Sequence, residues 1–179
     1  MEQKEVEKIL KGVQHSKADA IEKEDPDILQ LVCFKLADEE YAVKITKVKE
    51  VLRIQKITPV PQMPDFTLGV INIRGHIIPV FDLRKRFHLE EKELDETSKL
   101  LVASTQTAMI GIIVDEILDN IKIASSQINP TPIIQLKIDK KCIFGIASLE
   151  NRMIIIMDLE KLHEDILNGI NTPDLCIKP

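Results

Sequence analysis

The chain has 179 residues, of which 44% are hydrophobic, 30% are charged and only 3% are aromatic. This composition supports one ordinary domain or two small subdomains, and their core must be aliphatic because the chain has no tryptophan. A formal net charge of −5 argues against a nucleic-acid partner, because binding to a phosphate backbone requires concentrated positive charge.

The cysteines and the hydropathy indicate a protein of the cytoplasm. Cys33, Cys142 and Cys176 are far apart and form no Cys-x-x-Cys pair, so neither a disulfide framework nor a zinc site is expected. No apolar stretch approaches the roughly 20 residues of a membrane span, and the charged first residues are unlike a secretory signal. We therefore predict a cytoplasmic protein with no direct membrane insertion.

Residues 1–27 are predicted to be an N-terminal extension. Val6, Ile9, Leu10 and Val13 follow the spacing of one helix face, and the stripe then fades before Pro26. Two alternatives stay open for this segment. It is either a helix that docks on the body of the protein or one that frays in solution.

The chain from Ile28 onward has the texture of short strands. Residues 29–36 and 41–45 predict a strand, a turn and a second strand. The spacing of Ile45, Val48 and Leu52 predicts one or two helical turns over 46–51. Residues 57–64 contain three prolines, which cannot donate to a central ladder, so an extended crossing is expected there.

Residues 69–87 are the most informative passage. Two apolar strands flank Arg74-Gly75, which predicts a β-hairpin. Pro79 places the second strand at an edge or a bulge, and Asp82 can cap the short helical turn that follows. After a polar connection over 88–98, further strands are expected at 100–103, 109–114, 120–124, 142–149 and 152–157.

The passage that starts at Gly69 recurs at Gly145 with a constant offset. Ile78 falls on Ile154, and Asp82 falls on Asp158. Each copy follows a strand pair and a proline crossing. The repeat predicts a mainly β protein with two intertwined small-barrel subdomains of about five strands each, at roughly 28–90 and 99–165, and a tail at 166–179. The seam between the barrels is a natural docking place for a partner.

The search for catalytic and metal-binding motifs is largely negative. The sequence has no phosphate loop, no nucleophile elbow and no histidine pair at metal-ligand spacing. We interpret Asp115, Glu116 and Asp119 as a solvated acidic edge and the basic residues 84–86 as a solvated face. Arg74 is either a merely exposed hairpin residue or a multidonor anchor for a protein partner, and Glu50 has the same two readings.

Several ordered blocks of the sequence resemble the CheW family of chemotaxis coupling proteins. Residues 69–83 match its pattern Gly-Val-x-Asn-apolar-Arg-Gly-x-Ile-x-Pro-apolar-apolar-Asp-Leu. The other matching blocks are residues 38–41, 45–51, 58–61, 111–115 and 152–162. The resemblance covers roughly 28–165 and implies two SH3-like five-stranded barrels, with no enzymatic activity, no cofactor and no metal.

The resemblance also implies two protein partners. One is the regulatory domain of the histidine kinase CheA, and the other is the cytoplasmic hairpin tip of a chemoreceptor, which would recruit the protein to membrane-associated arrays. Receptor-binding residues of the family fall on Val48, Glu50 and Arg74. Kinase contact in the family is apolar, and we assign Phe66 and Leu68 to it. The alternative is a CheW-like adaptor of a chemosensory pathway that does not control motility.

Overall fold

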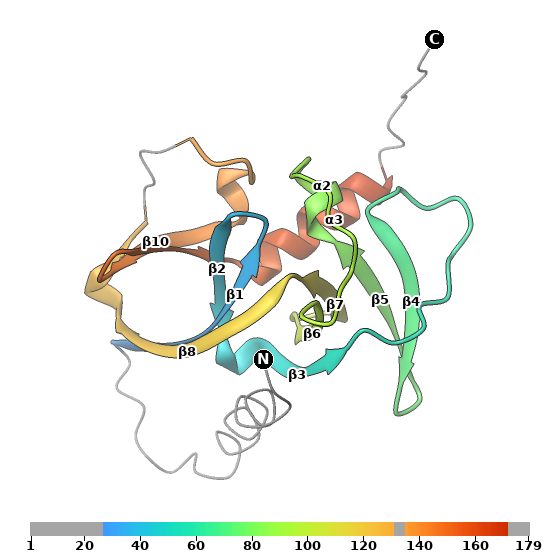
Figure 1. The fold of residues 1–179 in the computed structure, drawn as a ribbon, viewed down its shortest axis with the longest axis horizontal. Coiled ribbons are helices and arrows are strands. Elements are labelled where there is room, and N and C mark those ends of the chain that lie inside the picture. The colour runs from blue at the N-terminus through green and yellow to red at the C-terminus, as the bar shows by residue number, and fades with distance from the viewer. Residues whose placement is uncertain (1–26, 131–134, 172–179) are drawn as a thin grey trace.

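A computed structural model describes residues 27–130 and 135–171 (Figure 1), and the predicted N-terminal helix lies outside these residues. The fold is mainly β, as predicted. Its elements in chain order are β1 (Ile28–Leu36), β2 (Glu39–Lys44), η1 (Ile45–Lys47), β3 (Val48–Arg53), β4 (Thr67–Ile73), β5 (His76–Asp82), α2 (Leu83–Arg86), β6 (Lys99–Ser104), β7 (Met109–Val114), β8 (Glu116–Ala124), η2 (Ser125–Gln127), β9 (Ile128–Asn129), η3 (Lys140–Cys142), β10 (Ile143–Leu149), β11 (Arg152–Met157) and α3 (Leu159–Asn171).

The strands form two sheets that lie side by side, each curled around its own core (Figure 1). Sheet A has the order β8-β1-β2-β11-β10-β9, and sheet B has the order β3-β6-β7-β5-β4. Sheet B is thus built from one continuous stretch of chain, whereas sheet A combines the first two strands with the last four. The predicted ranges 28–90 and 99–165 therefore describe the two sequence repeats and not the two sheets.

The repeat is visible in the backbone geometry. In the first copy the N–H of Asp82 donates to the carbonyl of Phe66 at 2.8 Å, and in the second the N–H of Asp158 donates to Cys142 at 2.9 Å. Both hairpins also carry a register shift next to their first glycine, Gly69 or Gly145. The β4–β5 and β10–β11 hairpins are therefore two copies of one unit.

Each repeated hairpin joins the strand pair that belongs to the other half of the sequence. β5 lies parallel to β7, and β11 lies parallel to β2. Parallel neighbours need a long crossover connection. The connection from β2 to β11 passes through the whole of sheet B, and the connection from β5 to β7 contains α2, residues 88–98 and β6. This exchange of strand pairs links the two sheets through the covalent chain itself.

The proline crossing ahead of the first hairpin holds its edge. Thr58 and Val70 exchange two backbone hydrogen bonds of 2.9 Å. Gly69 sits against this crossing with φ +139°, and a Cβ there would lie 2.1 Å from the Thr58 carbonyl oxygen. β5 pairs with β7 only from Val80 onward, so Pro79 lies where that side of the strand is unpaired.

The predicted helical turns over 46–51 are wrong beyond Lys47. The chain makes one 3-10 turn over Ile45–Lys47 and then continues as the strand β3. A register shift between Val48 and Glu50 lets both Val48 and Val51 face the core although they are three residues apart. The spacing of Ile45, Val48 and Leu52 therefore comes from one residue of the 3-10 turn and two residues of a bulged strand.

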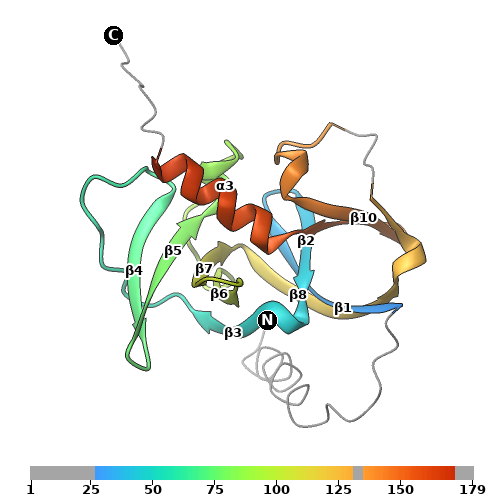
Figure 2. The same ribbon diagram turned by 180° about the vertical axis from the view of Figure 1, so that it is seen from behind.

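Three apolar clusters account for the packing. One fills sheet A around Leu31 and Ile154, and one fills sheet B around Ile71 and Leu100. The largest cluster contains residues from both sheets and from α3, which crosses in front of their junction in Figure 2. The two sheets therefore share buried surface as well as having separate cores.

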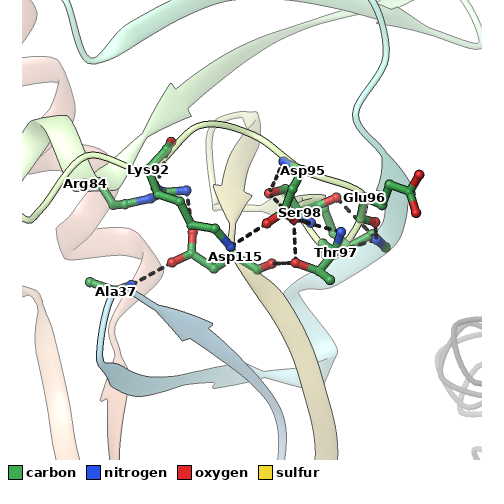
Figure 3. A network of polar contacts seen from close by, with 9 residues as sticks. Ala37, Arg84, Lys92, Asp95, Glu96, Thr97, Ser98 and Asp115 are labelled. Carbon is green, nitrogen blue, oxygen red and sulfur yellow. Dashed lines mark hydrogen bonds and ion pairs between the residues drawn. The ribbon is translucent and has the colours of Figure 1, made fainter. Parts of the chain in front are cut away.

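A buried ion pair at this junction overturns two sequence-based interpretations. Arg84 and Asp115 were expected to be solvated, yet their side chains are 1% and 7% exposed and form an ion pair. Arg84 Nη1 also donates to the carbonyl of Lys92 at 3.0 Å. Asp115 Oδ2 accepts from the Ala37 N–H at 2.8 Å, so one carboxylate joins the β1–β2 turn of sheet A to α2 beside sheet B (Figure 3).

The polar connection over 88–98 is fixed to the same junction. Asp95 Oδ1 accepts hydrogen bonds from the N–H groups of Thr97 and Ser98 at 2.9 and 3.1 Å. The Thr97 hydroxyl then donates to the Asp115 carbonyl at 3.0 Å (Figure 3). This connection therefore lies against the residues of the ion pair, whose side chains are largely buried.

We expect Asp115→Asn to lower the free energy of unfolding by about 3–5 kcal/mol, because it leaves the Arg84 guanidinium buried without a counter-charge. Urea unfolding of the two proteins measures this difference. Lys92→Ala is the matched control, since it breaks the Lys92–Asp95 pair, which is 47% and 44% exposed, and should cost at most about 1 kcal/mol. Equal midpoints for Asp115→Asn and the wild type would contradict the role of the buried pair.

Candidate partner-binding surface

The tip of the β4–β5 hairpin is a two-residue turn with an unusual backbone. Ile73 pairs with His76, and between them Arg74 and Gly75 have φ values of +51° and +86°. Two successive left-handed residues are typical of a type I′ turn, whose twist matches that of the flanking strands. In Figure 1 the β4–β5 hairpin projects from the end of sheet B, and the turn between these strands contains Arg74.

The structure brings together two of the three predicted receptor-binding residues. Arg74 Nη2 lies 3.2 Å from Glu50 Oε2, so the hairpin tip meets the edge strand β3. The Arg74 side chain is 80% exposed and the Glu50 side chain is 20% exposed. An exposed pair of this kind contributes little stability. Because the guanidinium makes only one contact to Glu50, its other donors remain available to a partner.

The third predicted receptor-binding residue is placed differently. Val48 is 3% exposed and belongs to the large apolar cluster between the sheets. Its side chain lies beneath the surface on which Glu50 stands, one register shift away. Val48 therefore supports this part of β3 from inside and presents no side-chain surface of its own.

The two residues assigned to kinase contact also lie mostly inside. Phe66 is 7% exposed, with the Arg86 guanidinium 5.4 Å from its ring centre and Gly169 of α3 packed on its edge. Leu68 is half-buried against the core of sheet B. Of the two, only Leu68 reaches the surface to a useful extent.

An apolar side chain next to the Arg74 turn was not singled out from the sequence. Ile77 is 63% exposed and pairs with Asn72 across the hairpin. It is the most exposed large hydrophobic residue in the described part of the chain. The signal for it was present, because strand alternation places Ile77 on the opposite face from buried Ile78.

The second hairpin carries a polar clasp that sequence reasoning missed. Arg152 makes two contacts to Asp119 of β8, at 2.9 and 3.0 Å, and a further one to Glu40 of β2 at 2.8 Å. The guanidinium thus joins three strands of sheet A. Asp119 was predicted to be solvated, but its hydrogen bonds with Arg152 lower the pKa of its carboxyl below the ordinary value. The repeat could not reveal this clasp, because Arg152 aligns with His76 rather than Arg74.

The described residues contain no group of three or more His, Cys, Asp or Glu side chains placed to hold a metal ion. Burial raises the pKa of the Cys33 and Cys142 thiols to about 12, which keeps them protonated near neutral pH.

A surface hollow of about 360 Å³ is lined largely by charged side chains, among them Asp38 and Glu90. No helix among the described residues has the length and apolar character to cross a membrane.

Asp119→Asn should make the protein less stable at pH 7. Because the folded-state pKa of Asp119 is lowered, its contribution is complete above the unfolded-state value near 3.8 and disappears as the pH falls through the folded-state pKa. The difference in urea midpoint between wild type and variant should therefore be constant from pH 7 to about pH 5 and shrink below pH 4. Glu164→Gln, which alters an exposed pair with Lys161, is the control and should show little difference. A difference in urea midpoint between wild type and Asp119→Asn that grows as the pH falls would contradict this role of Asp119.

Comparisons with known proteins identify relatives of this chain. A family model described as a CheW-like domain matches residues 30–166. The chemotaxis protein CheW of Bacillus subtilis strain 168 is 36% identical over 145 residues, which cover 81% of this chain and 93% of the relative. The chemotaxis protein CheW of Klebsiella aerogenes is 34% identical over 133 residues, which cover 74% and 80% of the two chains.

A solved structure supports the same assignment. The crystal structure of the scaffolding protein TtCheW from Thermoanaerobacter tengcongensis is similar with a TM-score of 0.71 and 36% sequence identity, over 78% of this chain and 90% of that one. The sequence comparison and the fold comparison therefore indicate the same family. These matches show that the chain belongs to the CheW family of chemotaxis scaffold proteins.

Proposed function

We propose that this chain is a non-catalytic adaptor that couples the cytoplasmic tip of a chemoreceptor to the regulatory domain of the histidine kinase CheA. The observation that carries the proposal is the Glu50–Arg74 pair, which sits exposed on a rigid two-residue turn of a domain in the CheW family. An arginine with free donors on such a support suits the recognition of another protein.

The receptor surface in this proposal centres on the tip of the β4–β5 hairpin. Arg74 and Glu50 supply a polar pair of opposite charges, and Ile77 supplies exposed apolar area on the same hairpin. An interface of this kind combines an apolar contact with polar anchors that set its orientation. Val48 acts indirectly, because its burial fixes the part of β3 that carries Glu50.

The kinase surface in this proposal lies elsewhere on sheet B. Leu68 stands near the start of β4, at the other end of the strand from the Arg74 turn. Phe66 precedes the strand and is buried in the large apolar cluster shared by the two sheets, so it supports this end of the hairpin from inside. Two partners can therefore occupy opposite ends of one hairpin at the same time. The adaptor acts by position, so signalling should depend on affinity and stoichiometry.

Arg74→Ala should weaken binding to a soluble fragment that carries the chemoreceptor tip by about tenfold or more, because it removes the exposed anchor. Isothermal titration calorimetry measures the affinity. Arg53→Ala is the matched control, since Arg53 is an exposed arginine of the same sheet and should leave binding unchanged. Circular dichroism and urea unfolding should match the wild type for both variants. Unchanged binding by a folded Arg74→Ala protein would contradict the receptor assignment.

Calorimetric titration against the regulatory domain of the CheA kinase of the same organism should show saturable one-to-one binding. Leu68→Ala should weaken this binding, and Arg74→Ala should leave it intact, because the two residues lie at opposite ends of β4 and its turn. The absence of binding at high micromolar concentration would contradict the kinase half of the proposal. Loss of kinase binding in Arg74→Ala would instead contradict the separation of the two surfaces.

A further inference from the structure

We propose that Asn72 is a positioning residue for Arg74, so that partner binding by Arg74 depends on a side chain that itself makes no partner contact. This inference rests on the proposed function. It arises from one hydrogen bond, in which the Asn72 Oδ1 atom accepts from the Gly75 N–H at 2.9 Å. No other side chain in the described residues bonds to the backbone of this turn.

The Arg74 backbone needs such support because it occupies a disfavoured region. Its φ of +51° is left-handed, where the Cβ of an L-residue crowds the neighbouring backbone. Gly75, with φ +86°, has no such penalty, and a Cβ there would meet nothing within 4 Å. The strain of the turn is therefore concentrated on the residue that carries the guanidinium.

The hydrogen bond from Gly75 controls the direction of Arg74. The Gly75 N–H belongs to the peptide plane that joins Arg74 to Gly75, so fixing this N–H fixes the ψ angle of Arg74. The backbone angles of Arg74 set the direction in which its side chain leaves the turn. In the observed arrangement that direction brings Nη2 to 3.2 Å from Glu50 Oε2.

The second hairpin shows what the first one lacks. Glu150 occupies the position of Arg74 and has nearly the same φ, +53°, so the two turns share their strained first residue. Ser148 stands where the first hairpin has Asn72, and the described contacts give it no bond to the turn. There the hairpin is held by the contacts of Arg152 to Asp119 and Glu40. At its turn the first hairpin has, among the described side-chain contacts, an exposed ion pair and the Asn72 hydrogen bond, so Asn72 is the main local restraint there.

The geometric part of the inference is tested without a partner, by amide hydrogen exchange in the full chain. Asn72→Ala should speed exchange of the Gly75 amide by about three- to tenfold, because the hydrogen bond is lost. Asn72→Asp keeps an oxygen acceptor and should stay close to the wild type. Ser148→Ala is the matched control and should not change exchange at Asn151. Equal Gly75 exchange in Asn72→Ala and the wild type would overturn the inference.

The functional part is tested by a double-mutant cycle against the soluble receptor-tip fragment. Asn72→Ala should weaken binding about three- to tenfold when Arg74 is present and change it less than about twofold in the Arg74→Ala background. If Arg74→Ala weakens binding but Asn72→Ala does not, the Asn72 inference is overturned while the proposed function stands. Equal effects of Asn72→Ala in both backgrounds also overturn it. If Arg74→Ala leaves binding unchanged, the proposed receptor contact itself fails, and the binding role of Asn72 fails with it.

Discussion

The ion pair between Arg84 and Asp115 is the interaction on which the arrangement of the two sheets depends. A guanidinium that is 1% exposed demands a compensating charge, and Asp115 supplies it from the junction between β7 and β8. The same carboxylate accepts the N–H of Ala37 in the β1–β2 turn. A change in the relative position of the sheets would break these contacts and leave a buried charge unpaired. Such a junction favours one arrangement over a continuum of similar ones.

The exchange of strand pairs gives the same constraint a covalent basis. Each repeated hairpin extends the strand pair from the other half of the chain, through β5 beside β7 and β11 beside β2. The large apolar cluster and α3 then fill the space between the sheets. An adaptor that works by position needs this rigidity, because two partners bound to a loosely jointed body would not have a fixed separation. The polar surface at the Arg74 turn thus stands on a frame whose geometry is set elsewhere.

The sequence predicted the local features of the fold well and the long-range ones poorly. The hairpin around Arg74-Gly75 was predictable because its turn chemistry and strand alternation are both local. The strand β3 was mispredicted because the 3-10 turn and the bulge that follows it gave Ile45, Val48 and Leu52 a helical spacing. The burial of Arg84 was missed, since nothing near it in the sequence indicates that Asp115 pairs with it.

In the candidate site, too, the sequence could not show which of the predicted side chains are buried. The resemblance to the CheW family pointed to Glu50 and Arg74, and the structure places them in contact. The resemblance also pointed to Val48, and we assigned Phe66 to an apolar contact, but both side chains are buried. A sequence motif cannot distinguish a buried side chain from an exposed anchor. The proposed roles of these residues differ accordingly. Some touch a partner, and others hold the strand on which the contact stands.

Native-state hydrogen exchange at increasing denaturant tests most directly whether the two sheets behave as one rigid body. The amides to follow are those of β2 and β11 in sheet A and of β6 and β7 in sheet B. If the two sheets form one rigid body, the slowest amides of both should converge on a single opening free energy, equal to that of global unfolding. An opening of one sheet at clearly lower free energy, with the other still protected, would contradict it.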